Sequence, residues 1–303
     1  MNPSLLILST LKRTPCFDTV FDFLEQQFST KTIKLKLSKK DSLNDLFNQY
    51  NVDNYQHILL DLPHHFLRKN CSLINQFSSK ITIYEEDACQ NFMPDSRWFG
   101  DFFQCYKKIG RTKVVNTGHH VSSQLKAQGI NSIFIPKGYD QKTINNLEIA
   151  REIPLAFIGT YRSNTYHERY KHIRHLELFA NLQTLRTNPG REYNETLNKI
   201  ACFFSADCGI GEYMAKNFEA MAAGCLLLAH RQGNDEEQAL GLKDGVNVLL
   251  YDTTKEAVEK FNWISRNPTQ AETIAMAGLK LAQQRFSFAS LGEQLTQAII
   301  KEI

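Results

Sequence analysis

The sequence predicts an α/β protein built from two parallel-sheet domains in tandem. Short apolar runs alternate with longer segments whose apolar residues recur at helical spacing. This alternation stops once, at the polar stretch 139–153, and then starts again. A length of 303 residues suits two domains of ordinary size. We therefore expect one domain over residues 1–145 and a second over residues 150–288.

In the first half, the alternation predicts a parallel sheet with helices on both faces, because parallel strands need crossover connections. The expected strands cover residues 5–9, 57–62, 80–85, 111–117 and 132–138. The expected helices cover residues 17–28, 41–50, 66–78, 95–107 and 119–128.

The second half has the same pattern, although it does not repeat the sequence of the first. The expected strands cover residues 154–160, 200–207, 225–230 and 247–252. The expected helices cover residues 167–183, 212–223, 254–265, 270–284 and 289–302.

Composition excludes several classes of protein. The net charge of +3 is too small to imply a nucleic-acid partner. The most basic stretch, 34–40, is interpreted as a strand end with solvated lysines, the alternative being a patch that touches anionic lipid. The apolar run at 5–9 is too short for a signal peptide or a membrane span. Seven cysteines without a C-x-x-C pair indicate reduced thiols and a cytoplasmic location.

Glycine is unevenly distributed along the chain. The first 99 residues contain none, whereas ten of the fifteen glycines lie beyond residue 150. Loops that cradle phosphate groups need glycine where the backbone approaches the ligand closely. The sequence therefore predicts a phosphate site in the second half.

The segment 206–224 (ADCGIGEYMAKNFEAMAAG) is the strongest candidate for that site. Gly209 and Gly211 come just before the expected helix, so free backbone N–H groups would meet a ligand at the carboxyl edge of the sheet. Lys216 and Glu219 are three residues apart and share one helix face. A cation suits a diphosphate, and a carboxylate suits the vicinal hydroxyls of a ribose. The alternative is an ordinary ion pair on an amphipathic helix.

The same segment resembles a known family. The run FEAMAAG at 218–224, followed by LLLA, is similar to the signature of group-1 glycosyltransferases of GT-B fold. The branch with a spore-maturation-protein-like C-terminal domain is the most similar. The matching positions are Lys216, Phe218, Glu219, Ala220, Ala222 and Gly224. The segments 154–164 and 244–288 also resemble this family in order and spacing.

The resemblance implies two Rossmann-like domains that face a cleft, with the C-terminal helix 289–303 crossing back to the first domain. It implies transfer of a sugar from a nucleoside diphosphate sugar, of UDP or GDP type, to an acceptor hydroxyl in glycoconjugate synthesis. The acceptor would be a saccharide, a lipid-linked molecule or a protein, with peripheral membrane contact as one possibility. No separate cofactor and no metal are expected, since a basic clamp on the diphosphate makes Mg²⁺ unnecessary.

Further donor-site residues follow from the same resemblance. Gly159 ends the expected strand 154–160, and Thr160 and Arg162 are expected to contact phosphate oxygens in the turn there. The alternative is a polar turn with a solvated arginine. Many relatives carry an acidic residue at the position of Gly211, whereas the nearest carboxylate here belongs to Glu212. Whether Glu212 takes over that role stays open at this point.

The acceptor side is expected at the end of a first-half strand. Glu85, Glu86 and Asp87 follow that strand, and a general base there would activate an attacking hydroxyl. Asp87 is the candidate base, with Glu85 as the other choice and capping of the next helix as the structural alternative. His119 opens an expected helix and is a second candidate.

Other classes of function remain compatible with these residues. One is a non-catalytic module that binds a nucleotide or a partner without turnover. Another is a nucleotide-sugar epimerase on the same fold. Release of nucleoside diphosphate from the donor distinguishes a transferase from a binding module, and a change in sugar identity without an acceptor identifies an epimerase.

Overall fold

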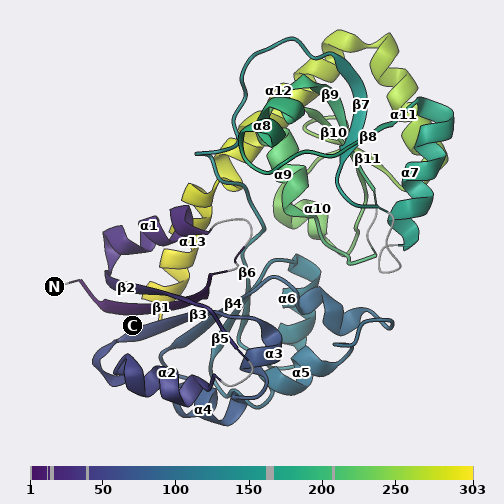
Figure 1. The fold of residues 1–303 in the computed structure, drawn as a ribbon. Coiled ribbons are helices and arrows are strands. Elements are labelled where there is room, and N and C mark those ends of the chain that lie inside the picture. The colour runs from purple at the N-terminus through teal and green to yellow at the C-terminus, as the bar shows by residue number, and fades with distance from the viewer. Residues whose placement is uncertain are drawn as a thin grey trace. The chain divides into compact units, whose positions relative to one another are not determined.

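The computed structural model describes residues 2–11, 13, 17–38, 41–161, 167–206 and 209–302. The chain forms two compact units (Figure 1). Unit 1 comprises residues 1–136 and 288–303, and unit 2 comprises residues 137–287. Each unit contains one parallel sheet with helices packed against it.

The sheet of unit 1 has the strand order β2-β1-β3-β4-β5-β6, and every pairing is parallel. Its strands are β1 (Ser4–Thr10), β2 (Ser29–Leu35), β3 (His57–Asp61), β4 (Ile81–Glu85), β5 (Lys113–Asn116) and β6 (Ser132–Phe134). The chain passes from β1 to β2 on one side and continues to β3 on the other. The topological switch point, where open α/β sheets bind ligands, therefore lies between β1 and β3.

The helices of unit 1 differ in places from the sequence prediction. They are α1 (Asp18–Gln27), α2 (Leu43–Gln49), η1 (Val52–Asn54), α3 (His64–Leu67), α4 (Cys71–Gln76), η2 (Ala88–Phe92), α5 (Asp101–Tyr106), α6 (His119–Ala127) and α13 (Phe288–Ile300). The helix expected over 66–78 is split into α3 and α4, and the one expected over 95–107 begins only at Asp101. Strand β2 was not predicted, because it is a half-exposed edge strand with lysines in place of an apolar run.

The C-terminal helix α13 packs on α1 in unit 1 (Figure 1), which confirms the predicted return to the first domain. Leu291, Leu295 and Ile299 of α13 are fully buried in the core of this unit. The two helices approach closely at Gly292, because an added Cβ would lie 2.6 Å from Phe23 Cβ and 3.2 Å from the Val20 carbonyl.

We expect Gly292→Ala to destabilise the protein, although alanine is normally the better helix former by about 1 kcal/mol. The new methyl group meets backbone and Cβ atoms that have no rotamer freedom, so overpacking costs about 1–3 kcal/mol. Urea unfolding of the variant and the parent measures this change. Gln297→Ala, at an exposed position of the same helix, is the control. A more stable Gly292→Ala variant would contradict the close packing.

The sheet of unit 2 has the strand order β11-β10-β9-β7-β8 and is also parallel. Its strands are β7 (Ile153–Ile158), β8 (Gln183–Leu185), β9 (Ile200–Ser205), β10 (Leu226–His230) and β11 (Leu249–Tyr251). Its helices are α7 (His167–Ala180), α8 (Arg191–Lys199), α9 (Ala215–Ala222), α10 (Glu236–Leu240), α11 (Thr254–Arg266) and α12 (Pro268–Arg285). The switch point lies between β7 and β9.

The polar stretch 139–153 is held to unit 2 by side-chain hydrogen bonds. The Asn145 N–H donates to Asn194 Oδ1 at 3.1 Å, and the Leu147 N–H donates to Asn198 Oδ1 at 2.7 Å. Arg151 donates to the carbonyls of Ile200 and Ala223. Before β7 this stretch has only an isolated β-bridge between Tyr139 and Ser287 and a turn at 141–143, and buried amides of α8 bond part of its backbone.

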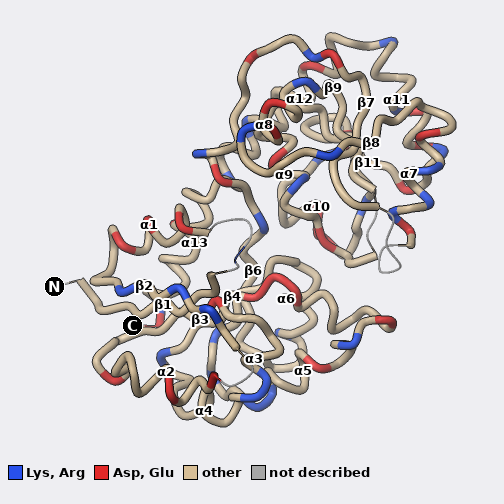
Figure 2. Tube along the Cα trace, in the orientation of Figure 1, with Lys and Arg blue, Asp and Glu red and all other residues tan. Residues whose placement is uncertain are grey.

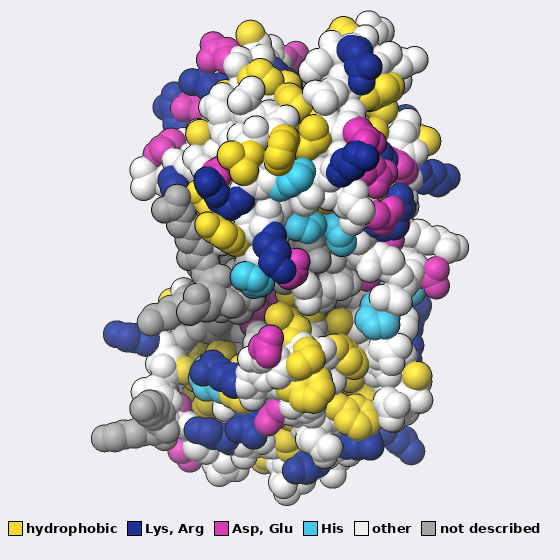
Figure 3. Space-filling model, turned by 90° about the vertical axis from the view of Figure 1, so that its right-hand side faces the viewer, with side chains coloured by type: hydrophobic (Ala, Val, Ile, Leu, Met, Phe, Trp, Pro, Cys, Tyr) yellow, Lys and Arg dark blue, Asp and Glu magenta, His cyan; other side chains and the backbone are white. Residues whose placement is uncertain are grey.

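Surface and core composition are ordinary for an α/β protein. Charged residues of both signs are interspersed along each unit (Figure 2), and the face in Figure 3 shows them mixed with apolar side chains. Each of the five cysteines that the structure describes is buried and is not part of a disulfide. Within the described ranges, none of the helices combines the length and the apolar character needed to cross a membrane.

Candidate functional site

The carboxyl edge of the unit 2 sheet places Lys216 at the switch point. Lys216 lies in the first turn of α9, and its Nζ donates to the carbonyl of Ile158, the last residue of β7, at 2.9 Å. The next residue, Gly159, has a φ of +140°, and a Cβ there would lie only 2.6 Å from Lys216 Nζ. Gly159 therefore makes room for the ammonium group, and the structure brings these two predicted residues together.

Glu219 follows one turn later on the same helix. Its Oε2 accepts a hydrogen bond from the Tyr193 hydroxyl of α8 at 2.6 Å. Burial raises the pKa of Glu219, while the Tyr193 hydrogen bond and the Lys216 charge both oppose that rise. Lys216 thus contacts β7 and Glu219 contacts α8, and the roles of both residues toward a ligand stay predictions.

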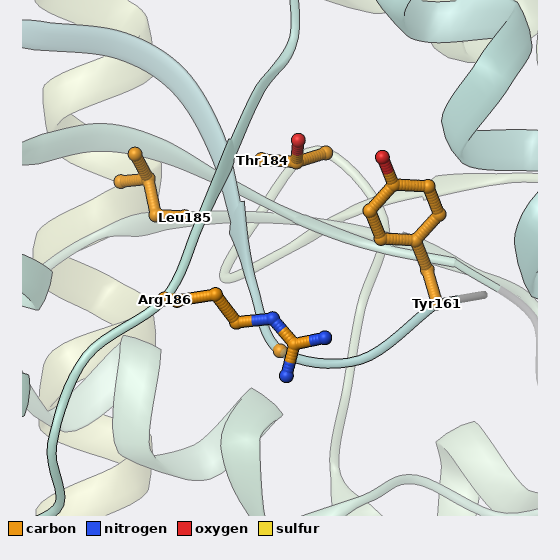
Figure 4. A pocket seen from close by; sticks show the side chains of 5 residues that line it. Tyr161, Thr184, Leu185 and Arg186 are labelled. Carbon is orange, nitrogen blue, oxygen red and sulfur yellow. The ribbon is translucent and has the colours of Figure 1, made fainter. Parts of the chain in front are cut away.

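A pocket of about 230 Å³ lies beside Gly159. Its lining residues come from the ends of β7 and β8: Gly159, Tyr161, Thr184, Leu185 and Arg186 (Figure 4). In Figure 4 the Arg186 side chain extends from β8 toward the turn that carries Tyr161. Arg186 Nη1 donates to Thr160 Oγ1 at 2.7 Å, so this guanidinium is held at the predicted phosphate turn.

A carboxylate of α7 accepts hydrogen bonds from two hydroxyl groups of this pocket. The Tyr161 and Thr184 hydroxyls each donate to Glu177 Oε1 of α7 at 3.3 Å. The sequence analysis did not identify Arg186 and Thr184. Strand β8 has only three residues and too few apolar side chains to be recognised as a strand. The predicted residue Arg162 lies outside the described residues.

The glycine loop before α9 differs from the prediction. Gly209 and Gly211 have φ values of +68° and +67°, the left-handed conformation that glycine adopts most readily. Helix α9 begins only at Ala215, so neither glycine adjoins its first turn and Glu212 is not on the helix. The predicted helix start at residue 212 is therefore wrong. Residues 209–212 instead form a non-helical turn, in which Gly209 and Gly211 have these positive φ angles.

Glu212 itself is almost fully buried, with 3% of its surface exposed. Its Oε1 lies 2.9 Å from the Nζ of Lys137, which is 8% exposed. Lys137 comes from the start of unit 2 and was not predicted to belong to the site. No local sequence signal marks this pair, because its members are 75 positions apart along the chain.

The acceptor-side candidates lie at the carboxyl edge of the unit 1 sheet. The register pairs Glu85 of β4 with Asn116 of β5, so Asp87 and His119 follow neighbouring strand ends. The Asp87 N–H donates to Glu85 Oε1 at 2.8 Å, and the Asp87 side chain does not cap η2. Burial raises the pKa of Glu85 to about 8. Near neutral pH Glu85 therefore holds its proton, whereas Asp87 is exposed, and the identity of the base stays a prediction.

His119 is the first residue of α6, as predicted. Its ring is half-buried and packs edge-on against Phe134 of β6, with ring centroids 5.5 Å apart. The pairing of β5 with β6 brings these residues to the same edge. Packing against Phe134 therefore orients the ring. The role of His119 as a second candidate base stays a prediction.

A charged network at the switch point of unit 1 was not predicted. Arg13 donates two hydrogen bonds to Glu86, at 2.7 and 2.9 Å, and its Nε lies 3.2 Å from Asp61 Oδ2. The Ser9 hydroxyl donates to the same Asp61 oxygen at 2.6 Å. Ser9 and Asp61 are register partners at the ends of β1 and β3. Arg13 follows the predicted strand 5–9, and Asp61 lies near the carboxyl end of the predicted strand 57–62. A search for polar side chains at the carboxyl end of every predicted strand would therefore have identified both.

Comparison with known proteins supports the same architecture. Residues 142–297, more than half of the chain, match the family described as glycosyl transferase-like. No curated protein matches the chain.

Several solved structures share the fold over nearly their full length. Anabaena Alr3699/HepE, solved in complex with UDP, is 12% identical with a TM-score of 0.68, covering 99% of this chain and 100% of that one. Sucrose-phosphate synthase from Thermosynechococcus elongatus is 12% identical with a TM-score of 0.70, covering 99% of each chain. A glycosyltransferase from Rickettsia africae is 11% identical with a TM-score of 0.66, covering 99% and 98%. At these identities the likeness concerns the fold.

Proposed function

The chain belongs to the glycosyltransferase-like family, and we propose that it transfers a sugar from a nucleoside diphosphate sugar to an acceptor hydroxyl. Its two parallel-sheet units and its structural neighbours confirm the predicted fold class, two Rossmann-like domains of GT-B type. One observation carries the functional proposal. The Lys216 ammonium lies against Gly159 at the switch point of unit 2, with the Glu219 carboxylate one turn further along the same helix.

The proposed chemistry concerns the leaving group. As the bond between the anomeric carbon and the diphosphate breaks, the diphosphate gains negative charge. Lys216, Arg186 and the backbone N–H groups of the turn 209–212 would stabilise that charge in a partly dehydrated site. This assignment needs no metal, so independence from metal stays a prediction of the proposal. Arg162, two positions after Thr160 in the sequence, is proposed to add a further cation.

Glu219 is proposed to bind the ribose and so to set the position of the donor. Both of its oxygens accept hydrogen bonds, and the Tyr193 hydroxyl uses only one lone pair of Oε2. The pocket beside Gly159 is the proposed place of the nucleobase, since it adjoins the phosphate turn and has donor and acceptor groups along an apolar wall. The UDP in the HepE structure makes UDP the first nucleotide to test.

On the acceptor side we assign the general base to Asp87. Glu85 holds a proton near neutral pH, because its pKa is raised to about 8, whereas the Asp87 side chain is exposed to an incoming hydroxyl. His119 at the next strand end is the second candidate. Whether the acceptor is a saccharide, a lipid-linked molecule or a protein, and whether the reaction takes place in the cytoplasm, remain expectations of the proposal.

Thermal unfolding with UDP, GDP, ADP and CMP, and with UDP-glucose and GDP-mannose, tests the donor assignment. A ligand at about 100 times its Kd adds about 2.7 kcal/mol to stability, so the matching nucleoside diphosphate should raise the Tm by several degrees. Free phosphate at the same concentration is the control. If no nucleoside diphosphate shifts the Tm, the proposed donor site is wrong.

The same ligands separate the transferase from its alternatives. A transferase releases nucleoside diphosphate slowly from its own donor by hydrolysis, and faster once an acceptor is present. Binding without any release identifies a non-catalytic module. A donor whose sugar changes identity without an acceptor identifies an epimerase.

A further inference from the structure

We propose that Lys137 is a positioning residue for the donor sugar, acting through its buried ion pair with Glu212. Glu212 would accept a hydrogen bond from a sugar hydroxyl, and Lys137 would hold that carboxylate in place. This inference rests on the proposed function, because it assumes a nucleotide sugar in unit 2. It adds a residue that neither the sequence motif nor the fold assigns to the site.

The geometry of the pair is well defined. Lys137 Nζ and Glu212 Oε1 are 2.9 Å apart, and their side chains are 9% and 1% exposed. The segment after Lys137 is anchored in unit 2, since the Tyr139 N–H donates to the Phe286 carbonyl at 2.9 Å. Glu212 follows Gly211, whose φ of +67° directs the chain into the turn before α9. Both partners therefore come from segments with fixed backbones.

Stability alone does not explain such a pair. Removing an ammonium and a carboxylate from water costs several kcal/mol for each ion, and a buried pair often contributes no more stability than packed apolar side chains would. Removing only one partner is worse, because it leaves the other charge buried and unpaired. What the pair does supply is a carboxylate held in one orientation at the ligand-binding edge of the sheet.

The position of the pair suits the sugar end of the donor. Glu212 lies four residues before Lys216, on the turn that leads into the same helix. A diphosphate bound at Lys216 would leave its sugar at this carboxyl edge. Neighbouring sugar hydroxyls both donate and accept hydrogen bonds, so a carboxylate beside an ammonium complements a vicinal diol. A nucleoside diphosphate that lacks the transferred sugar would make neither contact.

The test compares binding of a nucleoside diphosphate with binding of its sugar conjugate. The pairs UDP with UDP-glucose and GDP with GDP-mannose are titrated calorimetrically, and the pair that the parent protein binds is used for the variants. We expect Lys137→Met to bind the diphosphate as the parent does and the sugar conjugate about tenfold more weakly. KM for the donor should rise and kcat should fall, and Lys137→Arg should recover part of both.

Glu212→Gln should show the same selective loss. The double variant Lys137→Met with Glu212→Gln should be no worse than either single variant, because both act through one pair. The matched control is Lys113→Met, in unit 1. Lys113 is another buried lysine, 6% exposed, which donates to the Ala298 carbonyl at 2.9 Å and pairs with Glu302 at 2.5 Å. It should lower the Tm and leave both affinities unchanged.

Specific results of these titrations would contradict the inference. If Lys137→Met and Lys137→Arg weaken the diphosphate and the conjugate equally, or weaken neither, Lys137 does not position the sugar. If the parent protein binds no nucleoside diphosphate, the proposed function fails first, and that failure is seen before any variant is made. A sugar-selective loss in Lys113→Met would also overturn the inference, since it would show a general effect of removing a buried charge.

Discussion

Replacing Lys216 by alanine should lower kcat by about 100-fold or more while the chain stays folded, because a preorganised cation that faces developing charge contributes about 3–4 kcal/mol to the transition state. Lys216 Nζ donates a hydrogen bond to the Ile158 backbone carbonyl at the sheet edge, at 2.9 Å. Water reaches that carbonyl once the side chain is removed, so the cost in folding should be about 1 kcal/mol. Steady-state kinetics and thermal unfolding of the same preparation measure the two effects.

The control for this variant is Lys171→Ala on α7. Lys171 is exposed and forms an i,i+3 ion pair with Glu168 at 2.7 Å, which is the kind of contact that Lys216 would make if its role were only structural. An exposed pair of this kind contributes about 0.2–1 kcal/mol to stability. Equal losses of turnover and of stability in Lys216→Ala would favour the structural role and count against the phosphate assignment.

The second large effect concerns Glu219. We expect Glu219→Ala to weaken binding of the nucleoside diphosphate by about 1–3 kcal/mol, the usual cost of losing hydrogen bonds between a charged group and its partners. This corresponds to an increase in Kd of about 5-fold to 150-fold. Calorimetric titration measures the change directly. Because burial already raises the pKa of Glu219, removing its charge should not destabilise the fold greatly.

Tyr193→Phe is the matched control for Glu219. It removes the hydroxyl that donates to Glu219 Oε2 but leaves the carboxylate in place, so nucleotide affinity should change much less than in Glu219→Ala. A folded Glu219→Ala variant with unchanged affinity would reject the ribose role. A larger loss in Tyr193→Phe than in Glu219→Ala would instead assign the contact to the tyrosine.

The sequence predicted the central strands of both sheets because they are apolar and short. Strands β3, β4 and β10 are buried along nearly their whole length, and most of their residues are apolar. The edge strand β2 and the short strand β8 were missed for the opposite reason. They are only partly covered, and their polar residues are compatible with loops.

The candidate site shows the same division. By itself, the sequence determined which chemical groups meet on one helix, because Lys216 and Glu219 are three residues apart and helix geometry places them on one face. Only the tertiary structure decided that Arg186 reaches Thr160 and that Lys137 pairs with Glu212. Contacts within a helix turn follow from local backbone geometry. Contacts between distant segments depend on the order of the strands in the sheet and on which buried charged groups pair. No local pattern of residues specifies the strand order or these pairs.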